Sequence, residues 1–562
     1  MNQLSGAEAI VRMLKLHEVE YIFGLCGDTS LPFYDALYRT GQGITHVLTR
    51  DERSAAYMAD GYARVTGKVG VCEGPSGGGA TYILPGVVEA NESSIPVLAM
   101  TTDISTTGRG RFTLTELDQE ALFRPLCKWN RVADTGASLP GLFRTAFRAM
   151  TTGKPGAAHI GLPYDVQNQP VDEADIWADP RLGHFPSYRT GPDQAAVAEA
   201  AALLLGAKRP IFICGGGVVI SGGEAELVRL AEALQAPVAT TISGQGSIAE
   251  DHPLAVGVVG SNGGVVQTRE IVDSADLVVF VGCRAGSVTT ERWRHPKPGT
   301  VKIVHLDADP LVIGANYPAD AAVVGDARLC LAALADAVAK RAAANGEEVV
   351  KAIAAAKRAK FDAFRQLAES GDRPIRPERV VAELHRVLPR DATVVCDPGT
   401  PCPYFSAFYE FYETGRHFIS NRAHGALGYS MSAAVGAHIG RPKVKTVSVM
   451  GDGSFGFTSG ELETIVRLNV PITMVVISNS VYGWIKAGQR YGYDKRFYSV
   501  EFSRTDHAAV AQAFGVKSWR VEDPAQLRPA LQAAVEHGGP TLVDVICQPL
   551  DEARAPVSEW VA

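Results

Sequence analysis

The hydrophobic positions of this chain follow two alternating patterns. Short apolar runs rich in β-branched residues occur at 211–214, 277–281, 447–450 and 472–477. Longer stretches, in which apolar residues recur every three or four positions, separate them. Strands that alternate with amphipathic helices are typical of parallel sheets covered by helices on both faces. The pattern therefore predicts an α/β fold of doubly wound parallel sheets.

This alternation falls into three blocks of similar length. A chain of 562 residues is too long for one hydrophobic core, so three domains are expected. The expected domains span residues 1–175, 190–340 and 375–550, followed by a tail at 551–562. A polar, proline-bearing stretch at 163–192 predicts a linker between the first two domains.

Composition narrows the possible partners and the compartment. The net charge of −7 offers no basic stripe for nucleic acid or for a membrane surface. No apolar run is long enough to span a bilayer, and the N-terminus lacks the layout of a signal peptide. The nine cysteines contain no C-x-x-C pair. We expect a cytoplasmic protein without nucleic-acid or membrane partners.

The strongest chemical signal lies at two successive strand ends. Asp452 stands between two glycines directly after one strand, and Asn479 ends the next strand. Ligands of open α/β sheets bind beyond the carboxyl ends of strands, and carboxylate and amide oxygens suit magnesium. Gly451 and Gly453 would let the backbone approach a diphosphate, with a helix expected to begin near Ser459. Taken alone, the tripeptide is more often a simple turn.

A second signal lies in the first block. Residues 50–64 read Arg-Asp-Glu-Arg-Ser-Ala-Ala-Tyr-Met-Ala-Asp-Gly-Tyr-Ala-Arg. On physical grounds alone, Glu52 at the start of a helix is more often a solvated charge that suits the helix dipole. Together with Asp452 and Asn479, however, this string resembles the thiamine diphosphate enzymes that include acetolactate synthase, pyruvate oxidase and benzoylformate decarboxylase. Over the whole chain the resemblance is strongest to large subunits of acetolactate synthase.

The resemblance implies an N-terminal pyrimidine-binding domain, a central domain and a C-terminal diphosphate-binding domain. It also implies thiamine diphosphate and Mg²⁺ as cofactors. Glu52 would contact N1′ of the aminopyrimidine ring, where a proton favours the imine that activates the thiazolium. A buried carboxyl group has a raised pKa and can share its proton with such a nitrogen.

The remaining cofactor contacts are also implied by resemblance. Asp452, Asn479 and the backbone carbonyl of Val481 would bind the metal. The other cofactor-binding positions are Thr400, Gly425, Leu427, Gly453, Ser454 and Gly483. Leu427 would wedge under the bent cofactor, and the carbonyl of Gly425 would accept from its 4′-amino group. The chain departs from the family at Ser478, where an Asn is usual, and at Pro401, which cannot donate a hydrogen bond.

Fewer residues bear on the reaction itself. Asp28 stands where synthases have Gly and resembles the active-site Asp of pyruvate decarboxylases, although an Asp that caps a helix junction explains it equally well. Thr115 replaces a Gln that serves carboligation in the synthases. The candidate positions for the substrate pocket are Thr115, His424, Tyr482, Trp484 and Ile485. Core packing and a structural histidine are the alternative explanations.

These features predict decarboxylation of a 2-oxo acid with carboligation to a second carbonyl compound. The alternatives are a 2-hydroxyacyl-CoA lyase, an oxalyl-CoA decarboxylase, a simple 2-oxo acid decarboxylase, a non-catalytic homologue and an NAD(P) dehydrogenase. Residues 215–217 lack the G-x-G-x-x-G spacing, and 282–286 do not match the flavin pattern. We therefore expect no FAD, whereas ADP or CoA remains open. The resemblance implies a homodimer or homotetramer with active sites between subunits, acting on a small oxo acid or acyl-CoA.

Overall fold

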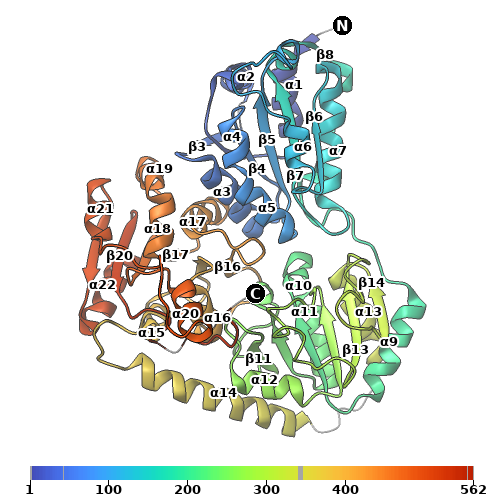
Figure 1. Cartoon of the computed structure of the whole chain (residues 1–562). Coiled ribbons are helices and arrows are strands. Elements are labelled where there is room, and N and C mark those ends of the chain that lie inside the picture. Colours follow the sequence, from blue (N-terminus) through green and yellow to red (C-terminus); the bar gives the residue numbers. More distant parts are fainter. Residues whose placement is uncertain (1–2, 42, 340–345, 554, 561–562) are drawn as a thin grey trace. The chain divides into compact units, whose positions relative to one another are not determined.

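The computed structural model describes residues 3–41, 43–339, 346–553 and 555–560. The expected domain limits at residues 1, 340 and 562 lie outside these residues. Within them the chain forms three six-stranded sheets flanked by helices (Figure 1). Every pairing inside these three sheets is parallel. The predicted fold class is confirmed.

The first sheet has the strand order β3-β2-β4-β5-β7-β6. Its strands are β2 (Tyr21–Gly24), β3 (Thr45–Leu48), β4 (Gly70–Gly74), β5 (Val97–Asp103), β6 (Trp129–Val132) and β7 (Ala158–Pro163). Its helices are α1 (Gly6–Leu16), α2 (Leu31–Thr40), α3 (Glu52–Thr66), α4 (Gly78–Tyr82), α5 (Leu84–Glu92), α6 (Gln119–Phe123) and α7 (Leu139–Thr151). β4, β5 and β7 are buried along their whole length, as expected for parallel strands covered on both faces.

The stretch expected to be a linker is partly regular structure instead. It contains α8 (Tyr164–Asn168) and β8 (Pro170–Asp172), and β8 pairs antiparallel with β1 (Gln3–Ser5). Val166 and Val171 are buried. Two apolar side chains among polar ones are enough to dock this segment on the first sheet's helices, a contact that local composition does not reveal.

The second sheet has the order β11-β10-β9-β12-β13-β14. Its strands are β9 (Pro210–Cys214), β10 (Val238–Thr240), β11 (Ala255–Val258), β12 (Leu277–Val281), β13 (Lys302–Asp307) and β14 (Ala321–Val324). Its helices are α9 (Gln194–Gly206), α10 (Gly216–Ser221), α11 (Glu224–Leu234), α12 (Val266–Asp273) and α13 (Ala327–Val338). The glycines at 215–217 lie against Gly282, where a Cβ at Gly215 would stand 2.2 Å from the Gly282 carbonyl oxygen. They therefore allow two strand ends to approach each other closely.

The third sheet has the order β16-β15-β17-β18-β20-β19. Its strands are β15 (Thr393–Cys396), β16 (Phe418–Ser420), β17 (Thr446–Gly451), β18 (Thr473–Ser478), β19 (Lys517–Val521) and β20 (Thr541–Ile546). The helices of this part of the sequence are α14 (Gly346–Ala368), α15 (Pro377–Val387), α16 (Pro401–Phe408), α17 (Tyr429–Gly440), α18 (Asp452–Thr458), α19 (Leu462–Arg467), α20 (Gly483–Gly492), α21 (His507–Ala513) and α22 (Pro524–Glu536).

Packing divides the described chain into two units, which we treat separately. One contains residues 3–188 together with 421–443 and 458–470, and the other contains the rest. In the first unit α17 packs closely on α3. A Cβ at Gly61 would lie 2.2 Å from the Ala433 carbonyl oxygen, and one at Gly436 would lie 1.9 Å from that of Met58. Glycine at these positions lets the two helix backbones touch. No helix in the described ranges has the length and apolarity needed to cross a membrane.

Candidate active site

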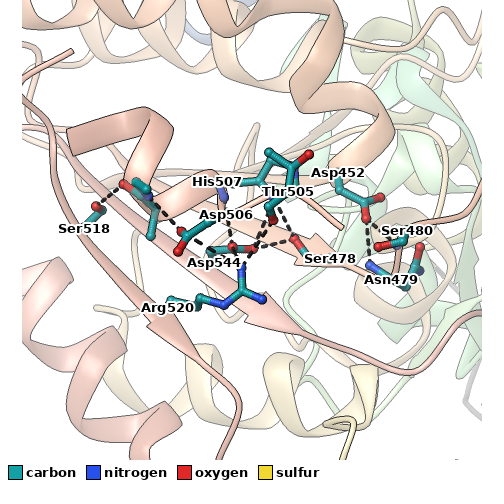
Figure 2. Close-up of polar contacts among 12 residues, drawn as sticks. Asp452, Ser478, Asn479, Ser480, Thr505, Asp506, His507, Ser518, Arg520 and Asp544 are labelled. Atoms are coloured by element: carbon teal, nitrogen blue, oxygen red, sulfur yellow. Dashed lines mark hydrogen bonds and ion pairs between the residues drawn. The ribbon is translucent and has the colours of Figure 1, made fainter. Parts of the chain in front are cut away.

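The carboxylate of Asp452 ties together the carboxyl ends of β17 and β18. Its Oδ2 accepts hydrogen bonds from the backbone N–H groups of Asn479, at 2.8 Å, and Ser480, at 2.6 Å (Figure 2). Its Oδ1 accepts from the N–H of Gly453 at 2.9 Å. The two strand ends expected to converge are thus in direct contact.

The helix after this strand begins earlier than predicted. α18 begins at Asp452, whereas the expected start near Ser459 is occupied by a 3₁₀ turn over Ser459–Glu461. Glycines at 451, 453 and 456 make the sequence resemble a loop. An acidic residue in the first turn and its bond to the Gly453 N–H favour the earlier start.

The residues around Asp452 fit a hard divalent cation. Asp452 is 5% exposed, and burial raises its pKa. Within the described residues no side chain forms an ion pair with it, and Nδ2 of the neighbouring Asn479 is buried without a hydrogen-bond partner. The Val481 N–H lies 3.3 Å from Oδ1 of Asn479. A buried carboxylate without an ion-pair partner among the described side chains, next to the amide oxygen of Asn479, offers oxygen donors of the kind that Mg²⁺ takes.

Ser478, which stands where the family has an Asn, faces a different network. Its hydroxyl donates to the fully buried Asp544 and lies 3.1 Å from Nδ1 of His507 (Figure 2). Asp544 also accepts from the His507 N–H and from Arg520. The Ser478 side chain thus supports the end of β18, while the backbone N–H of the next residue, Asn479, donates to Asp452.

Two pairs of predicted site residues lie together in the second unit, and each pair contains a predicted cofactor-binding glycine. A Cβ on Gly453 would stand 2.9 Å from Cε1 of Tyr482, and one on Gly483 would stand 3.2 Å from Oγ1 of Thr400. Thr400 is buried directly before α16, and Ser454 is buried in the first turn of α18. Both glycines therefore leave little room for a larger side chain at these positions.

The predicted pocket helix, α20, is partly covered by the C-terminal segment. Nε1–H of Trp484 donates to the backbone carbonyl of Trp560 at 3.0 Å, and their rings lie 5.2 Å apart. Ile485 and Tyr482 are exposed, at 55% and 39%. Of the three pocket candidates on this segment, Trp484 alone is held by the tail.

Glu52 opens α3 in the first unit, after Asp51 caps the helix through the Arg53 N–H at 2.8 Å. It is 6% exposed, and burial raises its pKa. Its Cγ lies 3.2 Å from where a Cβ on Gly74 would stand. Its Oε1 lies 3.1 Å from where a Cβ on Gly79 would stand. A carboxyl group with a raised pKa in a glycine-lined space suits proton sharing with a ring nitrogen.

A second buried carboxyl group near Glu52 was missed from the sequence. Glu73, at 1% exposed, ends the apolar run of β4 and accepts a hydrogen bond from the Tyr34 hydroxyl. Nε2 of His46 lies 3.4 Å from its Oε1. Its negative charge contributes to the raised pKa of Glu52, after burial and Asp51. A charged residue at the end of an otherwise apolar strand was the available signal.

Hydroxyl groups link Thr115 to Thr29, whose backbone N–H donates to Asp28. Thr115 lies 2.7 Å from the Ser76 hydroxyl, which lies 3.2 Å from that of Thr29. Asp28, which is exposed, accepts from the Thr29 N–H at 2.9 Å. Thr115 itself is exposed and has φ +69°. The structure thus joins two residues that the sequence singled out separately.

Gly425 and Leu427 lie in the loop between β16 and α17. Gly425 has φ +77°, and Leu427 is half-buried. The carbonyl of Ala426 accepts from Nδ2 of Asn421 at 2.6 Å within the loop. The His424 side chain is exposed.

Comparison with known proteins gives the same picture for all three domains. The N-terminal, central and C-terminal domain models of thiamine pyrophosphate enzymes match residues 4–122, 197–334 and 397–545, and the terminal two are described as TPP-binding. A probable acetolactate synthase large subunit from Methanocaldococcus jannaschii is 34% identical over 98% of this chain and 93% of its own. Acetolactate synthase isozyme 3 large subunit from Escherichia coli is 31% identical over 95% of this chain and 93% of its own.

These matches confirm the resemblance seen in the residues around Glu52, Asp452 and Asn479. They run through all three sheets, so the agreement is not limited to one motif. The chain therefore belongs to the thiamine pyrophosphate enzyme family and is a thiamine diphosphate-dependent enzyme.

Proposed function

We propose that this enzyme decarboxylates a small 2-oxo acid and joins the remaining acyl unit to a second carbonyl compound, as an acetolactate synthase does. One observation carries the proposal: the Asp452 carboxylate bridges the ends of β17 and β18, in a chain that matches synthase large subunits over nearly its full length. Magnesium at that position completes the proposed cofactor set.

Thiamine diphosphate, when bound, supplies a carbanion that attacks the carbonyl carbon of the substrate. The chain's own residues bind and orient it. Asp452, Asn479 and the carbonyl of Val481 hold the cation. Thr400, Gly453, Ser454 and Gly483 accommodate the diphosphate, and the close contacts of the two glycines leave little room for a larger side chain.

On the pyrimidine side, Glu52 holds the proton exchanged with N1′. Its burial raises the pKa of the carboxyl group and so favours the protonated form that can donate. Gly425 and Leu427 set the bend of the cofactor through a carbonyl oxygen and an apolar wedge.

Asp28 and Thr115 are the proposed residues for proton handling after the carboxylate leaves. The hydroxyls of Ser76 and Thr29 connect Thr115 to the residue next to Asp28, and Asp28 accepts from the backbone N–H of that residue, so the two proposed residues belong to one hydrogen-bonded segment. Trp484, Ile485 and Tyr482 are proposed to limit the size of the acyl group, and His424 to act as an acid or base near the ring. A small hydroxyl at Thr115 leaves space for the second carbonyl compound.

The proposed assembly is a homodimer or homotetramer with active sites between subunits, in the cytoplasm. The nine cysteines, all free thiols in the structure, support a reducing compartment. A nucleotide such as ADP, or the adenine part of CoA, stays a possibility for the central domain.

A second candidate is a CoA-dependent C–C lyase. The ordered C-terminal segment over α20 favours it, because a closing tail is the feature expected of that class. Turnover of an acyl-CoA substrate in place of pyruvate would decide for it.

The test is incubation of the purified protein with thiamine diphosphate, Mg²⁺ and pyruvate, with products followed by proton NMR. Two pyruvates should give one acetolactate and one CO₂. A Glu52→Gln variant should lose this turnover, whereas Glu383→Gln, which alters a buried glutamate of α15, should keep it. Acetaldehyde as the only product would make the enzyme a simple decarboxylase. Full activity in Glu52→Gln would refute the proposed role of Glu52.

A further inference from the structure

A buried ionic network joins α3, α5 and the loop that precedes α17, all in the first unit. Its members are Asp60 and Arg64 on α3, Glu89 on α5 and Tyr429 at the start of α17. Asp60, Glu89 and Tyr429 have no exposed surface, and Arg64 is 8% exposed. Nε of Arg64 donates to Asp60 at 2.8 Å, and Nη2 donates to Glu89 at 3.2 Å.

One carboxylate oxygen of Glu89 accepts hydrogen bonds from the backbone of this loop. Its Oε2 accepts from the N–H of His424 at 2.7 Å and from that of Ala423 at 3.2 Å. Its Oε1 accepts from Arg64 and from the Ser93 hydroxyl, at 2.6 Å. Four donors fill about the four lone-pair sites of an ionised carboxylate. The side chain is therefore fully satisfied only when the loop is in this position.

The same loop is held at its other end by Asp60. The hydroxyl of Tyr429, the first residue of α17, donates to Oδ2 of Asp60. Arg64 of α3 forms ion pairs with both carboxylates, so it connects the two anchors of the loop. That helix also carries Glu52 at its N-terminus.

Between the anchors the backbone turns through two left-handed positions. Gly425 has φ +77° and Gly428 has φ +85°, conformations that glycine adopts without strain. Such a segment has several accessible conformations when unrestrained. The direction of the Gly425 carbonyl and the position of Leu427 therefore depend on where the two anchors hold the chain.

We propose that Glu89 is a positioning residue for the cofactor: by holding the N–H groups of Ala423 and His424, it fixes the turn that presents Gly425 and Leu427 to the aminopyrimidine. The inference rests on the proposed roles of those two residues. Glu89 itself touches neither cofactor nor substrate.

The test compares Glu89→Gln with Glu383→Gln in the full-length protein. Glutamine keeps the size of the side chain, but one oxygen cannot serve both Arg64 and the loop. Glu383 is a matched control because it is 1% exposed and is also ion-paired with arginines, namely Arg379, Arg386 and Arg528. Both variants lose thermal stability, so stability alone does not distinguish them.

Hydrogen exchange of the apoprotein measures directly how well the loop amides are protected. In Glu89→Gln, peptides that contain the amides of Ala423 and His424 should exchange about 10- to 100-fold faster, as expected for loss of hydrogen bonds to a charged group. Calorimetry with Mg²⁺ present should show thiamine diphosphate affinity weakened about tenfold or more, on the same basis. Glu383→Gln should leave both quantities at the wild-type values.

A Glu89→Asp variant covers the case in which Glu89→Gln does not fold. It keeps the charge that pairs with Arg64 but is too short to reach both backbone N–H groups, so it should show the same two changes in smaller degree. Unchanged exchange at Ala423 and His424, or faster exchange with unchanged affinity, would overturn the inference alone. Failure of the wild type to bind the cofactor would overturn the proposed function with it.

Discussion

The indole N–H of Trp484 and the backbone carbonyl of Trp560 form a 3.0 Å hydrogen bond across 76 residues of sequence. The Trp560 ring also stacks on Tyr491 at 5.6 Å. The tail is held further along by backbone bonds from Gly263 to Pro556 and from Ser558 to Ser261. The C-terminal segment thus fixes the helix proposed to limit substrate size.

Replacing Trp560 by Ala should loosen this arrangement. We expect KM for the oxo acid to rise about three- to tenfold, as for loss of an aromatic pair worth about 0.5 to 1.5 kcal/mol, with a smaller change in kcat. Steady-state kinetics with substrates of increasing chain length measures it. Trp177→Ala is the control, because Trp177 is 58% exposed and lies in the first unit. Equal KM values for both variants would contradict the role of the tail.

Two glycines of α18 provide a matched pair. A Cβ at Gly453 would stand 2.9 Å from Tyr482, whereas one at Gly456 would meet nothing within 4 Å. Gly456→Ala should therefore leave cofactor binding intact and stabilise the helix by up to about 1 kcal/mol. Gly453→Ala should displace Tyr482 and weaken thiamine diphosphate binding.

Calorimetric titration of both variants with the cofactor, at saturating Mg²⁺, checks this expectation. Thermal unfolding of the same samples separates a loss of affinity from a loss of folding. If the two variants bind the cofactor equally, the Gly453–Tyr482 contact does not border the diphosphate.

The proposed metal site predicts the response to metal removal. Asp452→Asn keeps the shape of the side chain but removes the charge, so Mg²⁺-dependent binding of thiamine diphosphate should fall more than about 100-fold, beyond the loss typical of residues that only support metal ligands. Chelation of Mg²⁺ should weaken binding in the wild type but change little in this variant. Asp506→Asn, at an exposed helix cap of the same sheet, should respond like the wild type.

The sequence predicted those parts of the molecule that local pattern determines. Apolar strand runs fixed the parallel sheets, and the ends of β17 and β18 brought Asp452 and Asn479 together because parallel strands end at one edge. The capping box that Ser5 and Glu8 form at the start of α1 is local chemistry of the same kind. The early start of α18 did not, because three glycines in seven residues favour a loop until tertiary packing decides otherwise.

Other parts depend on contacts between distant segments. Glu89 sits among alternating apolar and polar residues of α5, where a glutamate normally faces solvent. Its partner His424 lies 335 residues away. Likewise, nothing local marks Glu73 as a partner of Tyr34 and His46. The partners of such buried carboxylates become visible only once the fold supplies them.

Glu461 shows how such burial affects stability. It accepts hydrogen bonds from the Arg50 N–H and the Thr464 hydroxyl, both at 2.8 Å. Arg50 lies two residues before Glu52, at which α3 begins. Burial raises its pKa from 4.5 to about 7. Between these values the folded state holds a proton that the unfolded chain has released. The free energy of unfolding therefore falls as pH rises from 4.5 to about 7.

Glu461→Gln should remove this dependence. The amide mimics the protonated carboxyl group, with its oxygen toward the Arg50 N–H and its nitrogen toward the Thr464 hydroxyl. Near pH 5 the variant and the wild type should unfold at similar temperatures. Above pH 7 the variant should be more stable by up to about 3 kcal/mol, at about 1.4 kcal/mol per pKa unit.

Thermal unfolding followed by circular dichroism across this pH range measures the difference between the two proteins. Other buried acids, such as Glu378, whose pKa is also raised to about 7 by burial, act equally on both proteins and cancel from the comparison. Glu348→Gln, on the exposed face of α14, should give a difference that does not vary with pH. A constant difference for Glu461→Gln as well would mean that Glu461 is ionised throughout and that its hydrogen bonds offset its burial.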